Sequence, residues 1–178
     1  MVRAKQPAAD DVIGCQTAML EWAESYDTKD WVRFVENASP TLYIDYRNFM
    51  DTFWGMYCGK FNGIAADRLV EAIPAQEFID KVADPGFLGN PRVKSSHFVG
   101  VSKFDQQDED FIIGTHQMRV THQRYKDDAL TEVQRAGNGS GNCIVHYRKI
   151  DGVWKWAGLM PGIRWKEAEF DKIFYTDD

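Results

Sequence analysis

The sequence lacks the signatures of secreted, membrane-spanning and disulfide-stabilised proteins. Its 178 residues include three cysteines, Cys15, Cys58 and Cys143, which are too few and too far apart for a disulfide framework or a CxxC metal site. No apolar run approaches the length that spans a membrane, and the charged first residues lack the apolar segment of a secretory signal. We therefore expect a cytoplasmic protein in a reducing compartment, with no membrane partner.

Positive charge and cofactor motifs are scarce as well. The net charge is −6 and no basic stripe occurs, so we expect no nucleic-acid partner. The chain contains no HxH or HExxH spacing for a metal, no glycine-rich phosphate loop after a strand, and no Gly-x-Ser-x-Gly nucleophile elbow. We expect neither a metal nor a nucleotide cofactor.

Apolar and aromatic residues, by contrast, are plentiful. Hydrophobic residues make up 44% of the chain and aromatic residues 13%, which is typical of a globular protein. The length fits a single domain, expected over residues 11–178 after a disordered leader at residues 1–10. The aromatic content suits a pocket for flat organic ligands, although an aromatic core explains much of it equally well.

The hydrophobic periodicity predicts helices first and an antiparallel sheet after them. Helices are expected at 11–26 and 28–35, the second capped by Thr28, and a third begins at Pro74. The expected strands are 41–47, 94–104, 111–124, 142–150 and 153–159. A loop at 55–70 is expected to contain a short helix near 65–70, and the tail at 163–174 is expected to end as a helix. This order is typical of an α+β fold, in which a curved sheet wrapped around helices encloses a cone-shaped cavity.

The most informative residues are two histidines on apolar strand faces. His97 alternates with Val99 and Val101, and His122 follows Val120 on the face of the next long strand. An imidazole in such a place is either a hydrogen-bonded core residue or part of a polar site in an apolar pocket. Because a neutral imidazole exchanges a proton near pH 7, the pair favours a pocket that moves protons.

A carboxylate and two tyrosines complete the candidate set. Tyr26 and Asp27 follow the first expected helix, where Asp27 either caps the next helix or orients a histidine. Tyr46 lies on an inward strand face and is either a core residue or a hydroxyl in the pocket. The other histidines, His116 and His146, are given mainly structural roles. The remaining set suits cofactor-free proton chemistry at a carbonyl compound: enolisation, elimination or isomerisation.

The segments that carry these residues resemble fungal scytalone dehydratase. They are Glu21–Trp31 (EWAESYDTKDW), Ile44–Arg47 (IDYR), His97–Gly100 (HFVG), His116–Asp127 (HQMRVTHQRYKD) and Ile150–Lys155 (IDGVWK). The resemblance runs from about Asp11 to Phe174. It implies a cone-shaped α+β barrel, also seen in ketosteroid isomerase and nuclear transport factor 2. A curved, mostly antiparallel sheet would pack on N-terminal helices under a C-terminal lid helix, in a homotrimer.

The resemblance also implies an activity and a role for each residue. The family removes water from a reduced naphthol-type polyketide on the way to dihydroxynaphthalene melanin, without a cofactor. Tyr26 and Tyr46 are implied to act on the substrate carbonyl as it becomes an enolate. His97, oriented by Asp27, is implied to take the proton and help the hydroxyl leave, while His122 binds and polarises the substrate.

Part of the expected substrate pocket departs from the family. The family has a serine and an asparagine, two residues apart, and without gaps these positions fall on Gly141 and Cys143. Ser140 and Asn142 have the right spacing, but a displacement of one residue points them to the opposite strand face unless a bulge restores them. Relative to the family, residues 55–70 look like an insertion, which we expect to cover or reshape the pocket mouth or to change the subunit interface. The aromatic walls of the pocket are expected to be Phe49, Phe170 and Phe174.

Three functions therefore remain open. Retained proton-handling residues beside altered substrate contacts favour a dehydratase that acts on scytalone or a related polyketide. An isomerase or cyclase would use the same base to enolise a ketone without losing water. A non-catalytic module would bind a polyketide without turnover, and the retained histidines argue against it.

Overall fold

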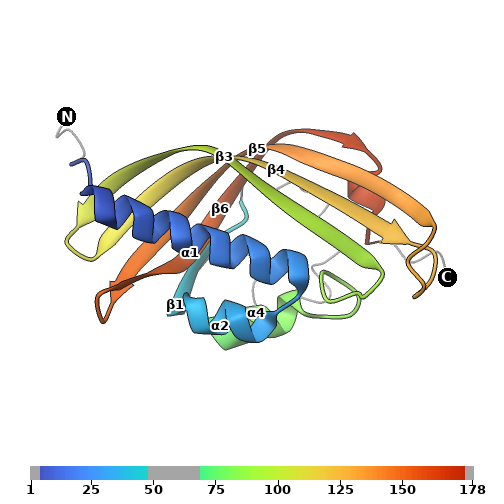
Figure 1. Ribbon diagram of the computed structural model, residues 1–178, viewed down its shortest axis with the longest axis horizontal. Helices are drawn as coiled ribbons and strands as arrows, with labels where there is room; N and C mark the ends of the chain where they lie inside the picture. Colours follow the sequence, from blue (N-terminus) through green and yellow to red (C-terminus); the bar gives the residue numbers. More distant parts are fainter. Residues whose placement is uncertain (1–4, 48–68, 175–178) are drawn as a thin grey trace.

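The computed structural model describes residues 5–47 and 69–174, which form helices packed on one curved sheet (Figure 1). The helices are α1 (Ala9–Thr28), α2 (Trp31–Asn37) and α4 (Ala75–Val82), and the 3₁₀ helix η1 (Phe170–Lys172) lies near the C-terminus. The strands are β1 (Ala38–Asp45), β2 (Leu69–Pro74), β3 (Val93–Asp108), β4 (Phe111–Tyr125), β5 (Val133–Ile150) and β6 (Val153–Ala168). The expected α+β class is confirmed.

The sheet has six strands in the order β2-β1-β6-β5-β4-β3. Only β1 and β6 pair in parallel, and the other neighbouring pairs are antiparallel. The four long strands β3 to β6 bend over α1 (Figure 1), so sheet and helix together enclose a cone. A register shift interrupts the β5–β6 ladder between Ser140 and Gly141, where a bulge increases the bend of the sheet.

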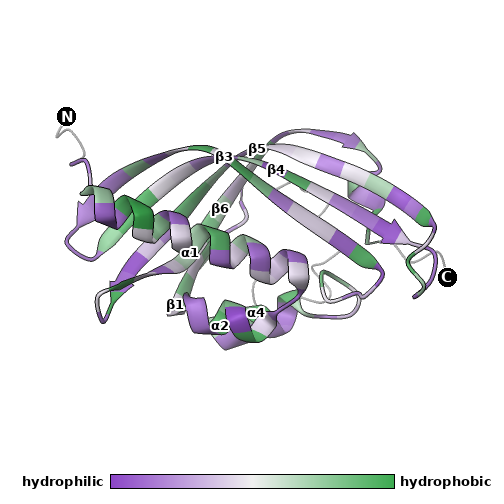
Figure 2. Ribbon diagram, viewed as in Figure 1, coloured by the Kyte–Doolittle hydropathy of each residue, from purple (hydrophilic) through white to green (hydrophobic). Residues whose placement is uncertain are grey.

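One face of α1 carries the core. Its buried residues recur at three- and four-residue spacing, which places them on one side of the helix: Cys15, Ala18, Met19, Trp22, Ala23, Ser25 and Tyr26. Trp22 stacks on Trp156 of β6 with ring centroids 5.9 Å apart, and Phe34 meets the edge of Trp156 at 5.5 Å. Figure 2 shows apolar residues along the middle of the sheet behind α1. Each large apolar side chain buried there contributes about 1.5–3 kcal/mol, so the helix is firmly held against the sheet.

The junction between α1 and α2 differs from the expected one. Thr28 is the last residue of α1 rather than the cap of α2, and its hydroxyl donates to the carbonyl of Glu24. Lys29 follows in the left-handed conformation, with φ 60°. Asp30 caps α2, because its side chain accepts the backbone N–H of Arg33 at 3.0 Å. Asp27 therefore does not cap α2.

Two expected boundaries are corrected near the N-terminus and after β1. The helix α1 begins at Ala9, and Lys5 forms a backbone bridge with Gln106, so residues 5–10 belong to the fold rather than to a disordered leader. Leu69 and Val70 open strand β2, where a short helix was expected. The rest of that segment, with Phe49, lies outside the described residues.

The tail at 163–174, expected to end as a helix, contains less helix than expected. Strand β6 continues to Ala168 because its last residues pair with the glycine-rich part of β5, from Gly137 opposite Ala168 to Asn142 opposite Gly162. Only η1 follows it. Phe170 and Phe174 are nevertheless buried against the sheet, as a lid segment requires.

Candidate active site

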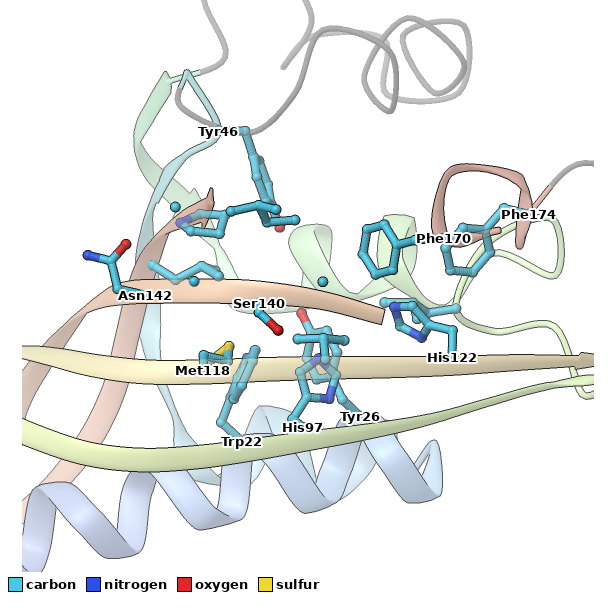
Figure 3. Close-up of a pocket in the computed structure, with 18 of the residues that line it drawn as sticks. Trp22, Tyr26, Tyr46, His97, Met118, His122, Ser140, Asn142, Phe170 and Phe174 are labelled. Atoms are coloured by element: carbon cyan, nitrogen blue, oxygen red, sulfur yellow. The ribbon is translucent and has the colours of Figure 1, made fainter. Parts of the chain in front are cut away.

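A cavity opens between the C-terminal half of α1, the inner face of the sheet and the turn that contains η1 (Figure 3). It offers about 110 Å³ to the centre of a water molecule, well above the ~10–15 Å³ that one water needs, so an organic ligand fits. Its polar lining includes Tyr26, Tyr46, His97 and His122. The apolar lining consists of Trp22, Phe87, Leu88, Met118, Val120, Leu159, Pro161, Ile163, Phe170 and Phe174.

Asp27, at the end of α1, makes two hydrogen bonds to His97 of β3. Its Oδ1 lies 2.7 Å from the imidazole Nδ1, and its Oδ2 accepts the backbone N–H of His97 at 2.8 Å. Because a carboxylate only accepts hydrogen bonds, Nδ1 carries the proton and the lone pair lies on Nε2. The His97 side chain is 7% exposed, and its ring centroid lies 4.9 Å from that of Trp22. The imidazole is thus held in place and largely shielded from solvent, an arrangement that suits a general base.

His122 is the second imidazole of the cavity, and it lies opposite Ser95 in the β3–β4 ladder. The Ser95 Oγ is 2.8 Å from the Nδ1 of His122. Burial, with smaller contributions from His97 and Lys29, lowers the pKa of His122 to about 3. His122 is therefore neutral near pH 7 and acts as a hydrogen-bonding group rather than a cation. Its ring centroid lies 6.4 Å from that of His97.

Two phenols complete the polar lining, of which Tyr26 is buried and Tyr46 is half-buried. Tyr26 meets the His97 ring edge-on at 5.8 Å, and Figure 3 shows Tyr46 across the cavity from His97. Burial, reinforced by the neighbouring Tyr46, raises the pKa of Tyr26 well above its usual value, and burial likewise raises the pKa of Tyr46. Both phenols keep their protons, so both can donate to a carbonyl or enolate oxygen.

Aromatic side chains wall the cavity beside His122. The rings of Phe170 and Phe174 lie 5.5 and 5.4 Å from that imidazole, and Phe87 packs on Phe174 at 4.9 Å. Arg124 of β4 donates from its Nη1 to the carbonyl of Ile173 at 3.3 Å, which ties the C-terminal segment to the sheet. The two walls expected near the C-terminus are in place, and Phe49 lies outside the described residues.

Strand pairing settles which face Gly141 and Cys143 occupy. In the β4–β5 ladder Gly141 lies opposite Met118 and Cys143 lies opposite His116, with no register shift in this stretch. Directly opposed residues share a face, so both positions are on the inner side of the sheet. An added Cβ on Gly141 would lie 2.0 Å from the carbonyl oxygen of Gly162, so no side chain fits there. Cys143 is buried but is not among the residues that line the cavity.

Ser140 and Asn142 line the cavity, but strand alternation turns their side chains to the outer face. Ser140 belongs to a row of outer-face partners across the sheet, in which it lies opposite Arg119 and Trp165. The Oδ1 of Asn142 lies against Gly162 of β6, where it would be 2.6 Å from a Cβ added to that glycine. Figure 3 shows the Asn142 amide turned away from the two imidazoles. The bulge at Ser140 lies in the β5–β6 ladder and does not bring either side chain inward.

The other two histidines lie away from the cavity lining, in keeping with structural roles. His116 is 1% exposed, and both its ring nitrogens are engaged at 2.8 Å, Nδ1 with Ser102 and Nε2 with Tyr147. Burial lowers the pKa of His116 to about 4. His146 lies on the outer face of β5, and the centroid of its ring is 4.5 Å from that of Tyr43, on which it stacks.

Sequence reasoning missed two neighbours of the imidazoles. Ser95 was not singled out, because its contact with His122 depends on a strand register that no local pattern encodes. The periodicity of the expected helix at 11–26 indicates only a core position for Trp22, not a contact with His97. A signal for it existed, since the four-residue spacing from Trp22 to Tyr26 puts both on one helix face.

Three further features concern metal ligands, membrane-spanning helices and thiols in the part of the chain that the structure describes. There, no three histidine, cysteine, aspartate or glutamate side chains cluster closely enough to hold a metal ion. No helix among residues 5–47 and 69–174 is long and apolar enough to cross a membrane. Burial raises the pKa of Cys15 and of Cys143 to about 12, so neither thiol is a ready nucleophile.

Comparison with known proteins gives consistent matches. A family profile described as scytalone dehydratase matches residues 8–70 and 60–178. The scytalone dehydratase-like protein AacuK of Aspergillus aculeatus is 47% identical over 100% of this chain and 93% of its own length. A scytalone dehydratase of Pyricularia oryzae is 44% identical over 92% of this chain and 86% of its own. The crystal structure of Kfla4162 from Kribbella flavida shares the fold, with a TM-score of 0.70, 12% identity and coverage of 94% and 99%.

Proposed function

This chain belongs to the scytalone dehydratase family, and from that membership we propose that it removes water from a reduced, naphthol-type polyketide such as scytalone or vermelone. In this proposal the enzyme is a hydro-lyase that works in the cytoplasm, serves fungal pigment or melanin biosynthesis and uses no cofactor. The observation that carries the proposal is the Asp27–His97 pair at a cavity that also holds two protonated phenols.

The proposed reaction is a base-catalysed elimination. The Nε2 of His97 takes the proton from the carbon next to the substrate carbonyl, and the electrons of that C–H bond form an enolate. Tyr26 and Tyr46 donate hydrogen bonds to the oxygen as its negative charge grows. The enolate then re-forms the carbonyl and expels the β-hydroxyl, which leaves as water with the proton held by His97. Asp27 stabilises the imidazolium between these steps.

His122 and the aromatic walls have binding roles in this scheme. A neutral imidazole held by Ser95 offers one ring nitrogen to a substrate oxygen without adding a charge to the cavity. Phe170 and Phe174 cover the apolar ring system and keep water away from the enolate. These roles divide the site into a base side and a binding side.

The altered substrate positions support a second candidate function. Neither Gly141 nor the buried Cys143 presents a polar group to the cavity, so the substrate differs from one that needs a serine and an asparagine there. An isomerase or cyclase would use the same base and phenols to enolise a different polyketide ketone without loss of water.

Product mass separates these functions. The purified chain is incubated with scytalone, vermelone and related cyclic ketols, and the products are analysed by mass spectrometry. A product lighter by one water supports the dehydratase, and a rearranged product of unchanged mass supports the isomerase. Binding without any product contradicts both and leaves a non-catalytic module.

We also propose that the chain assembles as a homotrimer through the outer face of its sheet. Phe98 and Trp165 are 69% and 54% exposed, and they stand at the two ends of one row of register partners across β3 to β6. Exposed apolar side chains grouped on one face mark interaction surfaces. Light scattering after gel filtration tests the assembly: three times the chain mass supports it, and a monomer of unchanged activity contradicts it.

A further inference from the structure

Lys29 occupies an unusual place between the proposed base and the cavity wall. It follows the last residue of α1 in the left-handed conformation, with φ 60° and ψ 32°, where glycine is the favoured residue. A lysine adopts this conformation only at a steric cost that glycine avoids. Its side chain is half-buried, which is costly for an ammonium group unless that group has a partner.

The partner is a backbone carbonyl on a distant loop. The Nζ of Lys29 donates a hydrogen bond to the carbonyl oxygen of Leu88. Leu88 and its neighbour Phe87 both line the cavity, and Phe87 packs on Phe174 of the C-terminal segment. The bond therefore joins the end of the helix that carries Tyr26 and Asp27 to a loop that forms part of the cavity wall.

The charge of Lys29 also reaches the proton-handling groups. The surrounding charged or titratable groups are Asp27 on α1, Lys94 on β3 and His122 on β4. The positive charge adds a small contribution to the lowered pKa of His122, which burial causes in the main. Within the loop itself, the Asp84 carboxylate is engaged by the backbone N–H of Gly86 at 2.7 Å.

We propose that Lys29 is a positioning residue for the reaction: its ammonium group forms a latch, a hydrogen bond that holds the Phe87–Leu88 wall against the catalytic end of α1. This inference rests on the proposed function for its kinetic consequences and on the hydrogen bond alone for its structural ones. Burial, with the charge of Lys94 adding, lowers the pKa of Lys29 to about 8. The latch therefore loses its charge just above neutral pH.

The test compares Lys29→Met, Lys29→Arg and a matched control, Lys155→Met. Lys155 also donates to a distant carbonyl, that of Glu36 at 2.7 Å, but neither residue lines the cavity. Lys29→Met is expected to lower kcat/KM by about 10- to 100-fold, mainly through KM, because a charge-assisted hydrogen bond is lost. Lys29→Arg is expected to restore most of it, and Lys155→Met to leave it unchanged.

The pH profile gives a readout that a merely structural role would not move. Activity of the parent is expected to fall as pH rises through about 8, where Lys29 loses its proton. In Lys29→Arg that fall moves to higher pH, because a guanidinium keeps its charge. An unchanged KM in Lys29→Met, or a fall near pH 8 that persists in Lys29→Arg, overturns the proposal.

Amide hydrogen exchange tests the latch without any turnover. The N–H groups of Phe87 and Asn90 bond within the loop, to Asp84 and Phe87, and are expected to exchange at least about tenfold faster in Lys29→Met. Lys155→Met is expected to show the parent rate at both amides. If no substrate is turned over, the proposed function fails while this measurement still decides the latch: faster exchange supports it, and unchanged exchange overturns it.

Discussion

The Asp27 carboxylate accepts two hydrogen bonds from His97, one from the imidazole Nδ1 and one from the backbone N–H, although the two residues are 70 positions apart in the sequence. One carboxylate thereby sets both the tautomer of the ring and the position of its strand relative to helix α1. Such double anchoring leaves the imidazole little freedom to rotate, which is what a general base in a preorganised site requires.

Replacing that carboxylate separates its two tasks. In Asp27→Asn the amide oxygen can still accept the backbone N–H of His97, but the ring loses the anion that stabilises its protonated form. We expect kcat to fall by about 10²- to 10⁴-fold with little change in thermal stability. Single-turnover kinetics with scytalone measure this. Asp105→Asn, which breaks an ion pair with the exposed Lys103, is the control and should keep full activity.

Two buried histidines make the fold sensitive to acid. The folded-state pKa is about 4 for His116 and about 3 for His122, both below the unfolded value of 6.5. The unfolded chain therefore takes up protons first as pH falls, so stability is full above about pH 6.5 and is lost toward pH 4.

His116→Gln tests that dependence. The free energy of unfolding from urea titrations should decrease by about 1.4 kcal/mol per pH unit for each such histidine below pH 6. The variant, with one titrating imidazole fewer, should show a correspondingly shallower slope between pH 6 and pH 4.5. Equal slopes in the variant and the parent would mean that His116 does not contribute.

Gly141 cannot take the serine that the family pattern places there. In Gly141→Ser the new Cβ would lie 2.0 Å from the Gly162 carbonyl oxygen, so the β5–β6 ladder must shift. We expect a loss of about 3 kcal/mol or more in unfolding free energy and no gain in activity. The control is Gly100→Ala, whose Cβ meets the Gln117 side chain at 3.3 Å and should cost less than about 1 kcal/mol. A stable, more active Gly141→Ser variant would show that the strands can separate here.

Much of the fold was predictable because its signals are local. The three- and four-residue spacing of α1 and the alternation in β3 and β4 are set by which side chains face the core, and the α+β order followed from them. The C-terminal part was not predictable in this way. Phe170 and Phe174 are four residues apart, a spacing typical of a helix. However, pairing with the glycines of β5 keeps β6 extended to Ala168. Tertiary pairing there outweighs local propensity.

The candidate site was predictable in its residues but not in its contacts. The apolar strand faces around His97 and His122 indicated a pocket, and the roles came from the family resemblance. The contacts of Ser95 with His122 and of Lys29 with Leu88 depend on strand register and on a loop that returns over the cavity. Neither is encoded in a short stretch of sequence, so only the structure shows them.

The most direct test of the proposed function is the turnover of a His97→Ala variant. Purified parent, His97→Ala and His146→Ala are incubated with scytalone, and loss of water is followed by mass spectrometry and absorbance. His146 lies outside the cavity lining and is the matched control. We predict that parent and control lose water at similar rates, while His97→Ala still binds the substrate but is slower by about 10²-fold or more. Dehydration by His97→Ala at the parent rate would contradict the assignment of His97 as the base.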